Sequence, residues 1–237
     1  GFLTNTVIGN IADSREFNGF GEIAGYAASA SGSSLYAATY TRDALGRVAS
    51  QTETLGGVTT ERAYEYDVRG RLVSVKTDGI VTEWYAYDLN GNRTNSLAGV
   101  STYDAQDRMT AGPGMAFSYD LNGSLTNRQP TAYSLQPTAF SYDLFGQLKS
   151  VTLPDDRVVS YDRDALSRVV AKRVDGIKVR GWVYKDALKP IAETDADGNV
   201  VSFFVYGTSP LSPDTMTKNG VSYRFIRDVQ GSVRLVV

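Results

Sequence analysis

A short pattern recurs along this chain of 237 residues. It reads aromatic, any residue, Tyr, Asp, two residues, Gly, any residue and then an aliphatic residue. The clearest copies begin at Tyr64, Tyr85, Phe117 and Phe140, and looser copies cover 40–48, 103–108 and 161–169. A constant core at uneven spacing indicates a fixed turn between strands of varying length. The repeat therefore constrains the fold more than any other feature of the sequence.

Each position of the pattern has a physical role in a β-hairpin. Residues two apart on a strand share one face, so Tyr64 with Tyr66 is a same-face aromatic pair, and repeated pairs predict cross-strand aromatic ladders. The Asp ends the strand, because its carboxylate can accept the backbone N–H two residues later. The Gly three residues after the Asp supplies the positive φ that closes the turn. A degenerate copy lies at 17–23.

The residues that we expect to build these turns are the tyrosine, aspartate and glycine of each copy. They are Tyr40, Asp43, Gly46, Tyr66, Asp67, Gly70, Tyr87, Asp88, Gly91, Tyr103, Asp104, Tyr119, Asp120, Gly123, Tyr142, Asp143, Gly146, Tyr161 and Asp164.

Two-residue turns are predicted at the other ends of the strands. Asp78-Gly79, Asp175-Gly176 and Gly56-Gly57 separate β-rich segments and are typical of tight hairpins. Strands are expected near 71–77, 80–87, 168–174 and 177–185. The prediction is an all-β fold in which antiparallel β-hairpin repeats join into one sheet.

Composition excludes several classes of function. The chain has neither Cys nor His, which removes disulfides, thiol nucleophiles, zinc sites built on these residues and catalytic triads that use His. The net charge of -2 does not favour nucleic acid, and no apolar run is long enough to span a membrane. The absence of an initiator Met indicates a piece of a longer protein.

Three more specific functions are less well supported by the sequence than ordinary turns and solvated surface residues. The segments 88–92 and 195–199 resemble calcium loops, but their Gly comes too early for an EF-hand. The pairs Asp155-Asp156 and Asp162 with Asp164 have the residue types of glycosidase carboxylates, without a sign of a cleft. The basic surplus over 149–189 is largely offset by six Asp residues, which favours a solvated strand face. No cofactor or metal is predicted.

The repeats resemble the RHS/YD-repeat family, which includes bacterial RHS proteins, the B and C components of insecticidal toxin complexes and the teneurin YD shell. The resemblance covers nearly the whole chain. Near the C-terminus, 182–184, 190–193, 197–200 and 205–207 follow the approach to the RHS-associated core, and 223–235 is similar to a segment of that core. Val229-Gln230 stands where many members have His-Leu.

The resemblance implies part of a spiralling β-sheet shell that encloses a C-terminal toxin for secretion and delivery. It implies YD repeats over 1–181 and their continuation into an RHS-associated core over 182–237, as one continuous unit. The implied partners are the rest of the parent chain and its enclosed toxin domain, and the implied location is secreted or at the cell surface.

The shell's self-cleavage segment and effector do not occur before Val237, so neither activity is assigned to a residue of this chain. An adhesion or carbohydrate-binding module that uses exposed aromatic residues is the alternative, with cell-surface glycans as its ligands. An enzyme is the poorest hypothesis, because His and Cys are absent.

Overall fold

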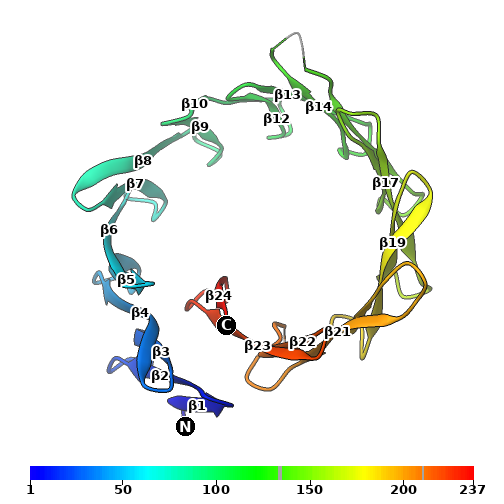
Figure 1. Ribbon diagram of the computed structural model, residues 1–237. Helices are drawn as coiled ribbons and strands as arrows, with labels where there is room; N and C mark the ends of the chain where they lie inside the picture. Colours follow the sequence, from blue (N-terminus) through cyan, green and yellow to red (C-terminus); the bar gives the residue numbers. More distant parts are fainter. Residues whose placement is uncertain (133–134, 210) are drawn as a thin grey trace. The chain divides into compact units, whose positions relative to one another are not determined.

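The computed structural model describes residues 1–132, 135–209 and 211–237, and every regular element within them is a β-strand (Figure 1). The strands pair antiparallel with their neighbours in the chain and form two sheets, one of ten strands over 5–100 and one of fourteen strands over 102–236. The prediction of one sheet is therefore wrong at this point, because the single residue between Val100 and Thr102 is too short for a hairpin turn. The predicted all-β hairpin fold is confirmed. The chain divides into unit 1, formed by 1–86, 212–215 and 222–237, and unit 2, formed by 87–211 and 216–221.

Unit 1 contains a meander of eight strands and the C-terminal hairpin. The meander strands follow one another in chain order. They are β1 (Asn5–Ile8), β2 (Ile11–Phe17), β3 (Ile23–Ala30), β4 (Ser33–Arg42), β5 (Val48–Leu55), β6 (Val58–Tyr66), β7 (Leu72–Thr77) and β8 (Ile80–Tyr87), and the hairpin strands are β23 (Val221–Arg227) and β24 (Val233–Val236).

Unit 2 contains a short hairpin and a longer meander, again in chain order. The hairpin strands are β9 (Arg93–Ser96) and β10 (Gly99–Val100). The meander strands are β11 (Thr102–Tyr103), β12 (Met109–Gly112), β13 (Met115–Tyr119), β14 (Leu125–Pro130), β15 (Thr138–Tyr142), β16 (Leu148–Thr152), β17 (Val158–Arg163), β18 (Val169–Val174), β19 (Ile177–Tyr184), β20 (Pro190–Thr194) and β21 (Val200–Val205), with β22 (Thr215–Lys218) across the boundary of the units.

The predicted strands and tight turns agree with these bounds. The segments expected near 71–77, 80–87, 168–174 and 177–185 are β7, β8, β18 and β19. The two central residues of the turns at 56–57, 78–79 and 175–176 all have positive φ, as type I′ hairpin turns require. The division predicted between 181 and 182 falls inside β19 and stays a prediction.

The aspartate of each Asp-Gly turn also reaches the strand beyond its own hairpin. The Asp78 carboxylate accepts the backbone N–H of Glu61 at 2.8 Å, and the Asp78 N–H donates to the Glu61 carbonyl at 2.8 Å. Asp175 makes the same two contacts with Val158, each at 2.8 Å. Asp78 and Asp175 therefore continue the backbone pairing with the preceding strand as far as the hairpin turn.

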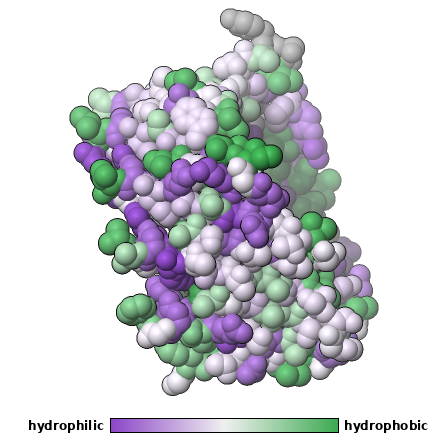
Figure 2. Space-filling view, turned by 90° about the vertical axis from the view of Figure 1, so that its left-hand side faces the viewer, coloured by the Kyte–Doolittle hydropathy of each residue, from purple (hydrophilic) through white to green (hydrophobic). Residues whose placement is uncertain are grey.

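Buried apolar residues concentrate in unit 1. Tyr36 and Ile226 are fully buried, and Ile11, Tyr26, Ala28 and Ala38 complete one cluster between β2, β3, β4 and β23. Elsewhere most strand residues are half-buried or exposed. In Figure 2 the hydrophobic residues form separate groups among polar ones rather than one continuous patch.

Candidate functional site

The turn at Asp67 shows how the repeat folds the backbone. The Asp67 Oδ1 accepts the backbone N–H groups of Arg69 and Arg71, both at 2.9 Å. The Gly70 N–H donates to the Asp67 carbonyl at 2.9 Å, and Gly70 has a φ of 81°. The Asp67 N–H donates to the Arg71 carbonyl at 2.9 Å. This is a type I turn followed by a glycine bulge, a common way to close a hairpin with the strand twist preserved.

The same arrangement recurs at the other predicted turns. In each, the side chain of the Asp accepts backbone N–H groups two and four residues later, or four residues later in the case of Asp88. The aspartates that hold these turns are Asp43, Asp88, Asp104, Asp120, Asp143 and Asp164. The glycines with positive φ are Gly46, Gly70, Gly91, Gly123 and Gly146. Asp107 and Ser167 take the glycine position in two turns with φ of 60° and 64°.

An arginine four residues after the Asp completes four of these turns. Arg71 donates from Nε to the Asp67 Oδ2 at 2.8 Å and places Nη2 at 2.7 Å from the same oxygen. Arg47, Arg108 and Arg168 hold Asp43, Asp104 and Asp164 in the same way. This spacing is visible in the sequence, but the repeat pattern that predicts the turns does not include it.

These contacts set the protonation of the turn carboxylates. The side-chain hydrogen bonds from Arg47, Arg108 and Arg168 are the largest cause of the lowered pKa of their partners Asp43, Asp104 and Asp164. At Asp67 the largest cause of the lowered pKa is the backbone N–H of Arg71. All these carboxylates are therefore charged at neutral pH and act as hydrogen-bond acceptors only.

The tyrosine before each Asp reaches back to the previous repeat. The Tyr66 hydroxyl donates to the Val48 carbonyl at 2.8 Å, and Val48 directly follows the turn of Asp43. The predicted residues Tyr103, Tyr119 and Tyr142, together with Tyr184 and Tyr206, donate at 2.8–3.0 Å to the carbonyl at the same position after an earlier turn. The hydroxyl therefore couples successive repeats, and the bond satisfies the polar end of a half-buried tyrosine.

The arginine of one turn also covers the tyrosine of the next. The Arg47 guanidinium lies 4.4 Å from the ring centre of Tyr66, and Arg108 and Arg168 lie 5.1 and 5.0 Å from those of Tyr119 and Tyr184. We call the series of Asp, Arg four residues later, and next Tyr the turn ladder. The predicted ring-on-ring ladder is replaced at these three turns by guanidinium on ring, which is favourable at short range.

Tyr40 and Tyr161 occupy the first aromatic position of their copies, three residues before the Asp. An arginine stands directly before the Asp instead. Arg42 donates to the Gly46 carbonyl and to the Ile23 carbonyl at 3.0 and 3.3 Å, and Arg163 donates to Ser167 and Leu148 carbonyls at 2.9 and 3.4 Å. Arginine at this position thus spans two repeats like the tyrosine hydroxyl. Tyr87 ends β8 directly before Asp88.

The degenerate copy at 17–23 forms the same turn, and further turns with this geometry lie outside the copies that the pattern identified. Asn18 accepts N–H groups from Phe20 and Glu22, so an amide serves in place of the carboxylate. Asp195 and Asp228 do the same at 195–199 and 228–232. The segment 153–157 closes with the same pair of backbone contacts, and in 185–189 the Lys185 N–H donates to the Lys189 carbonyl at 2.9 Å. A search for any Asx residue followed three residues later by Gly would have found the turns at 195–199 and 228–232.

The carboxylates considered for metal binding or hydrolysis are engaged in turns and ion pairs. Asp88 and Asp195 accept side-chain hydrogen bonds from Asn92 and Asn199 at 2.9 and 3.1 Å. Asp155, Asp162 and Asp164 pair with arginines at 2.6–2.9 Å. Within 1–132, 135–209 and 211–237, no group of three or more Asp or Glu residues is placed to hold a metal ion, and no helix could cross a membrane.

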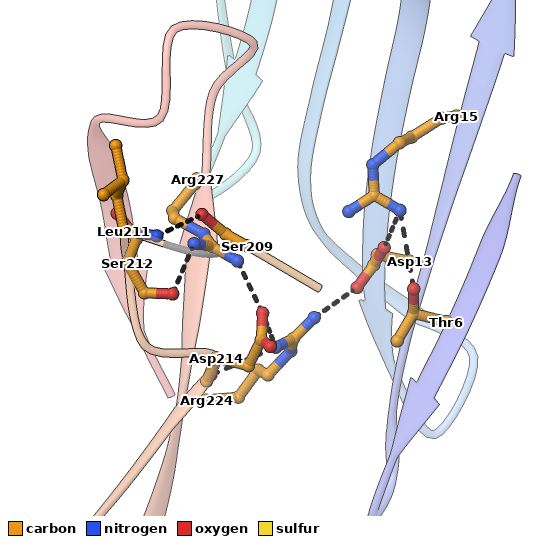
Figure 3. A network of polar contacts seen from close by, with 9 residues as sticks. All are labelled: Thr6, Asp13, Arg15, Ser209, Leu211, Ser212, Asp214, Arg224 and Arg227. Carbon is orange, nitrogen blue, oxygen red and sulfur yellow. Dashed lines mark hydrogen bonds and ion pairs between the residues drawn. The ribbon is translucent and has the colours of Figure 1, made fainter. Parts of the chain in front are cut away.

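A second polar arrangement, which the sequence did not predict, lies inside unit 1 (Figure 3). Arg224 of β23 is buried and pairs with Asp13 of β2 at 2.8 Å and with Asp214 at 3.2 Å. Arg15 binds the other oxygen of Asp13 at 2.8 Å, and Arg227 pairs with Asp214. We call these five residues the clasp, because they join strands 211 residues apart in sequence.

A second, smaller group of ion pairs surrounds Glu53 of β5. This buried carboxylate pairs with Arg62 of β6 at 2.9 Å and with Arg234 of β24 at 2.6 Å. Burial raises the pKa of Glu53, but hydrogen bonding from Arg62 and the charge of Arg234 outweigh it, and the net pKa is lowered. Both groups hold the C-terminal hairpin on the N-terminal strands. Their carboxylates face guanidinium groups, which suits attachment rather than proton transfer.

The comparisons with known proteins agree with the repeat architecture. The family model described as Teneurin YD-shell matches residues 2–237. The chain is 29% identical to mouse Teneurin-4 over 169 residues and 31% identical to the tRNA nuclease WapA of Bacillus subtilis over 143 residues. These matches cover 68% and 56% of the chain and 6% of each relative.

Among solved structures, the chain is similar to a chain of the Photorhabdus luminescens Tc holotoxin pore. That match has 12% identity and a TM-score of 0.41, and it covers 100% of this chain and 16% of the other. The chain therefore spans only a small part of the length of each of these three proteins.

Proposed function

The chain belongs to the teneurin YD-shell family, and we propose that it is a wall segment of a β-sheet shell that encloses a C-terminal toxin domain of its parent protein during secretion and delivery. A structural role in such a shell follows from the family. The enclosed cargo, the secreted or cell-surface location and the lack of catalysis by this segment are our proposals.

The pairing of successive hairpins within each of the two sheets is the observation that carries the proposal. Each YD turn returns the chain to the neighbouring strand, and each tyrosine hydroxyl or arginine ties that turn to the one before it. A repeat that contacts only its neighbours can be extended without limit, as in other repeat proteins. Such a sheet is suited to covering a large surface.

The similarity to WapA supports, by analogy, a toxin domain as the enclosed cargo. WapA of Bacillus subtilis is named a tRNA nuclease, and the part of it that this chain matches is only 6% of its length. Most of that protein therefore lies outside the matched repeats, which leaves room for an effector. We propose the same division of labour for the parent of this chain, with the repeats over 1–181 and 182–237 as wall.

Protease protection of the parent protein tests the proposal. The region downstream of Val237 is expected to resist a protease while the wall is intact and to become cleavable when residues 87–211 are deleted. A parent variant with Val68→Thr serves as the matched control, because Val68 is fully exposed. Equal cleavage in all three proteins, or a parent without a downstream domain, would contradict enclosure.

A hollow in unit 1 favours glycan binding as a second candidate function. It has a volume of about 290 Å³ and is lined by Tyr40, Tyr64 and Tyr66 with Gln51 and Gln230. Aromatic faces beside amide groups are suited to stack on and hydrogen-bond a sugar ring. Binding on a glycan array that is lost in Gln230→Ala and kept in the control Gln106→Ala would support this candidate, and an array without signal would remove it.

A further inference from the structure

Two neighbouring hollows lie on one face of the strands of unit 1. The hollow that favours glycan binding, of about 290 Å³, is lined by residues of β4–β7 and by the C-terminal turn at 228–230. A second hollow, of about 640 Å³, is lined mainly by the turns at 18–22 and 43–46. Tyr40 belongs to both linings, so the two hollows adjoin at this residue. We call them together the tyrosine groove.

Asp228 is the carboxylate of the tyrosine groove that has no ion pair. Its Oδ1 accepts the backbone N–H groups of Gln230 and Ser232 at 3.0 and 2.9 Å. Ser232 stands where four other turns have the arginine that binds Oδ2, and this oxygen has no hydrogen-bond partner within the part of the chain that the structure describes. The other carboxylates of the groove, Glu22 and Asp43, each pair with an arginine. One negative charge is therefore unpaired, which favours a ligand with a positively charged group.

Two amide side chains beside Asp228 require hydrogen-bond acceptors as well as donors. Gln51 accepts the Tyr64 hydroxyl through Oε1 at 2.9 Å, and its Nε2 makes no hydrogen bond to a described residue. The side chain of Gln230 is exposed. A lysine side chain carries donors only, so it would pair with Asp228 and leave the Gln51 Nε2 unsatisfied. A sugar with an amine carries a charged donor together with hydroxyl groups that accept, and therefore matches both residues.

The adjoining hollow extends the site beyond one sugar ring. Phe20 lines it and is 93% exposed, so its ring is open to a ligand. Glu22 contacts Asn18 and Arg42 through Oε2, at 2.8 and 3.3 Å, which leaves Oε1 as an acceptor. Each hollow thus combines aromatic side chains with a carboxylate oxygen that a ligand can reach, and Tyr40 lies between the two sets.

We propose that the tyrosine groove binds an oligosaccharide of amino sugars, with an ammonium group of the ligand at the Asp228 carboxylate. Sugar rings lie against the aromatic residues on either side of Tyr40, and their hydroxyl groups accept hydrogen bonds from Gln51. This ligand class rests on the glycan-binding candidate and narrows it, and it is independent of the proposed enclosure.

Isothermal titration calorimetry with two linear tetramers tests this ligand class. One is a tetramer of glucosamine, and the other is a tetramer of glucose with the same linkage, in which a hydroxyl replaces each amine. The wild-type chain is expected to bind the glucosamine tetramer about tenfold or more tightly, because a charge-assisted hydrogen bond is stronger than a neutral one. Added salt should reduce this preference. The variant Asp228→Asn should abolish it, since the amide oxygen keeps the turn contacts and the charge is lost.

The matched control is Asp143→Asn in unit 2. Asp143 accepts the same two backbone N–H groups at 2.8 and 2.9 Å and also lacks an arginine four residues later. This variant should leave both affinities unchanged. If Asp228→Asn lowers the melting temperature, Phe20→Ser provides a second variant at an exposed position. It should weaken binding of both tetramers, because both lose the same stacking contact.

Equal affinity for the two tetramers in the wild-type chain would overturn the amino-sugar inference while glycan binding stands, and no binding of either tetramer would remove both. A tetralysine peptide is the third ligand. If it binds more tightly than the glucosamine tetramer and is lost in Asp228→Asn, the groove is a site for basic peptides and the inference is wrong.

Discussion

Unit 1 and unit 2 are built from the same repeat, yet they are stabilised differently. Unit 1 buries Tyr36 and Ile226 completely and encloses the clasp, where Arg224 is only 4% exposed. In unit 2 the residues at or below 9% exposure are small or β-branched, such as Val159, Ala171 and Ala192, and none belongs to a comparable apolar cluster among the described residues. Its sheet relies on backbone pairing and on the turn ladder.

This difference shows how much of the fold the repeat itself supplies. A YD turn satisfies its own backbone donors through one carboxylate and fixes its neighbour through one tyrosine or arginine, so a sheet can grow without a second layer. The C-terminal hairpin adds such a layer in unit 1 and brings with it buried charges that must be paired. The following variants should therefore affect the two units unequally.

Loss of Arg224 should have the largest effect. The variant Arg224→Ala leaves Asp13 and Asp214 buried without their shared partner, and we expect the free energy of unfolding of unit 1 to fall by about 3–5 kcal/mol. Chemical denaturation measures this. The control Arg157→Ala removes an ion pair in unit 2 in which both side chains are more than half exposed, and it should cost less than about 1 kcal/mol. Similar losses in both variants would refute a special role for the clasp.

A β-branched residue at a turn glycine should have the next largest effect. Gly70 has a φ of 81°, and the variant Gly70→Val should destabilise the chain by about 1–3 kcal/mol because valine is strained there. Val68→Thr, at an exposed position of the same turn, should change stability by no more than about 0.5 kcal/mol. Equal shifts of the thermal midpoint would show that the turn assignment is wrong.

Acid should weaken the turn ladder in both units. The turn carboxylates Asp43, Asp67, Asp104 and Asp164 have a pKa below the ordinary value of 3.8 in the folded chain. A lowered folded pKa means that the unfolded chain binds protons more readily, so their contribution is present above the unfolded pKa and is lost as pH falls through the folded pKa. Unfolding midpoints should be flat from neutral pH to about 5 and decline below about 3.8. A decline that begins near pH 6 would point to other groups.

A glycine at position 167 should produce the smallest effect, and a favourable one. Ser167 has a φ of 64° at the turn position where other copies have Gly. The variant Ser167→Gly relieves this strain, and the relief should exceed the conformational entropy that the more flexible glycine loses on folding. We expect unit 2 to become more stable by about 0.5–1 kcal/mol. A thermal melt measures the change. The control Ser160→Gly, in the middle of β17, should destabilise instead.

The turns and strands could be predicted because their signals are local. Asp, Gly and the spacing between them determine where the backbone reverses, and the Asp-Gly hairpins at 78–79 and 175–176 have an unmistakable composition. The Arg contribution to the ladder is also local, since Arg71 lies four residues from Asp67, and a search at that spacing would have found it.

The clasp could not be predicted from local patterns. Asp13 and Arg224 are far apart in sequence, and nothing around either residue marks it as buried. Their pairing depends on where the C-terminal hairpin packs, which is a property of the tertiary fold. The same holds for Tyr36, whose hydroxyl pKa is raised chiefly by burial, although its sequence context is that of an ordinary strand.

Hydrogen–deuterium exchange on the Arg224→Ala variant shows whether the YD turns hold a sheet without a buried core. We expect faster exchange than in the wild type over 1–86 and 222–237, with exchange over 87–132 and 135–209 unchanged. Exchange that accelerates equally in both units would contradict it, because the strands of unit 2 would then depend on the core of unit 1.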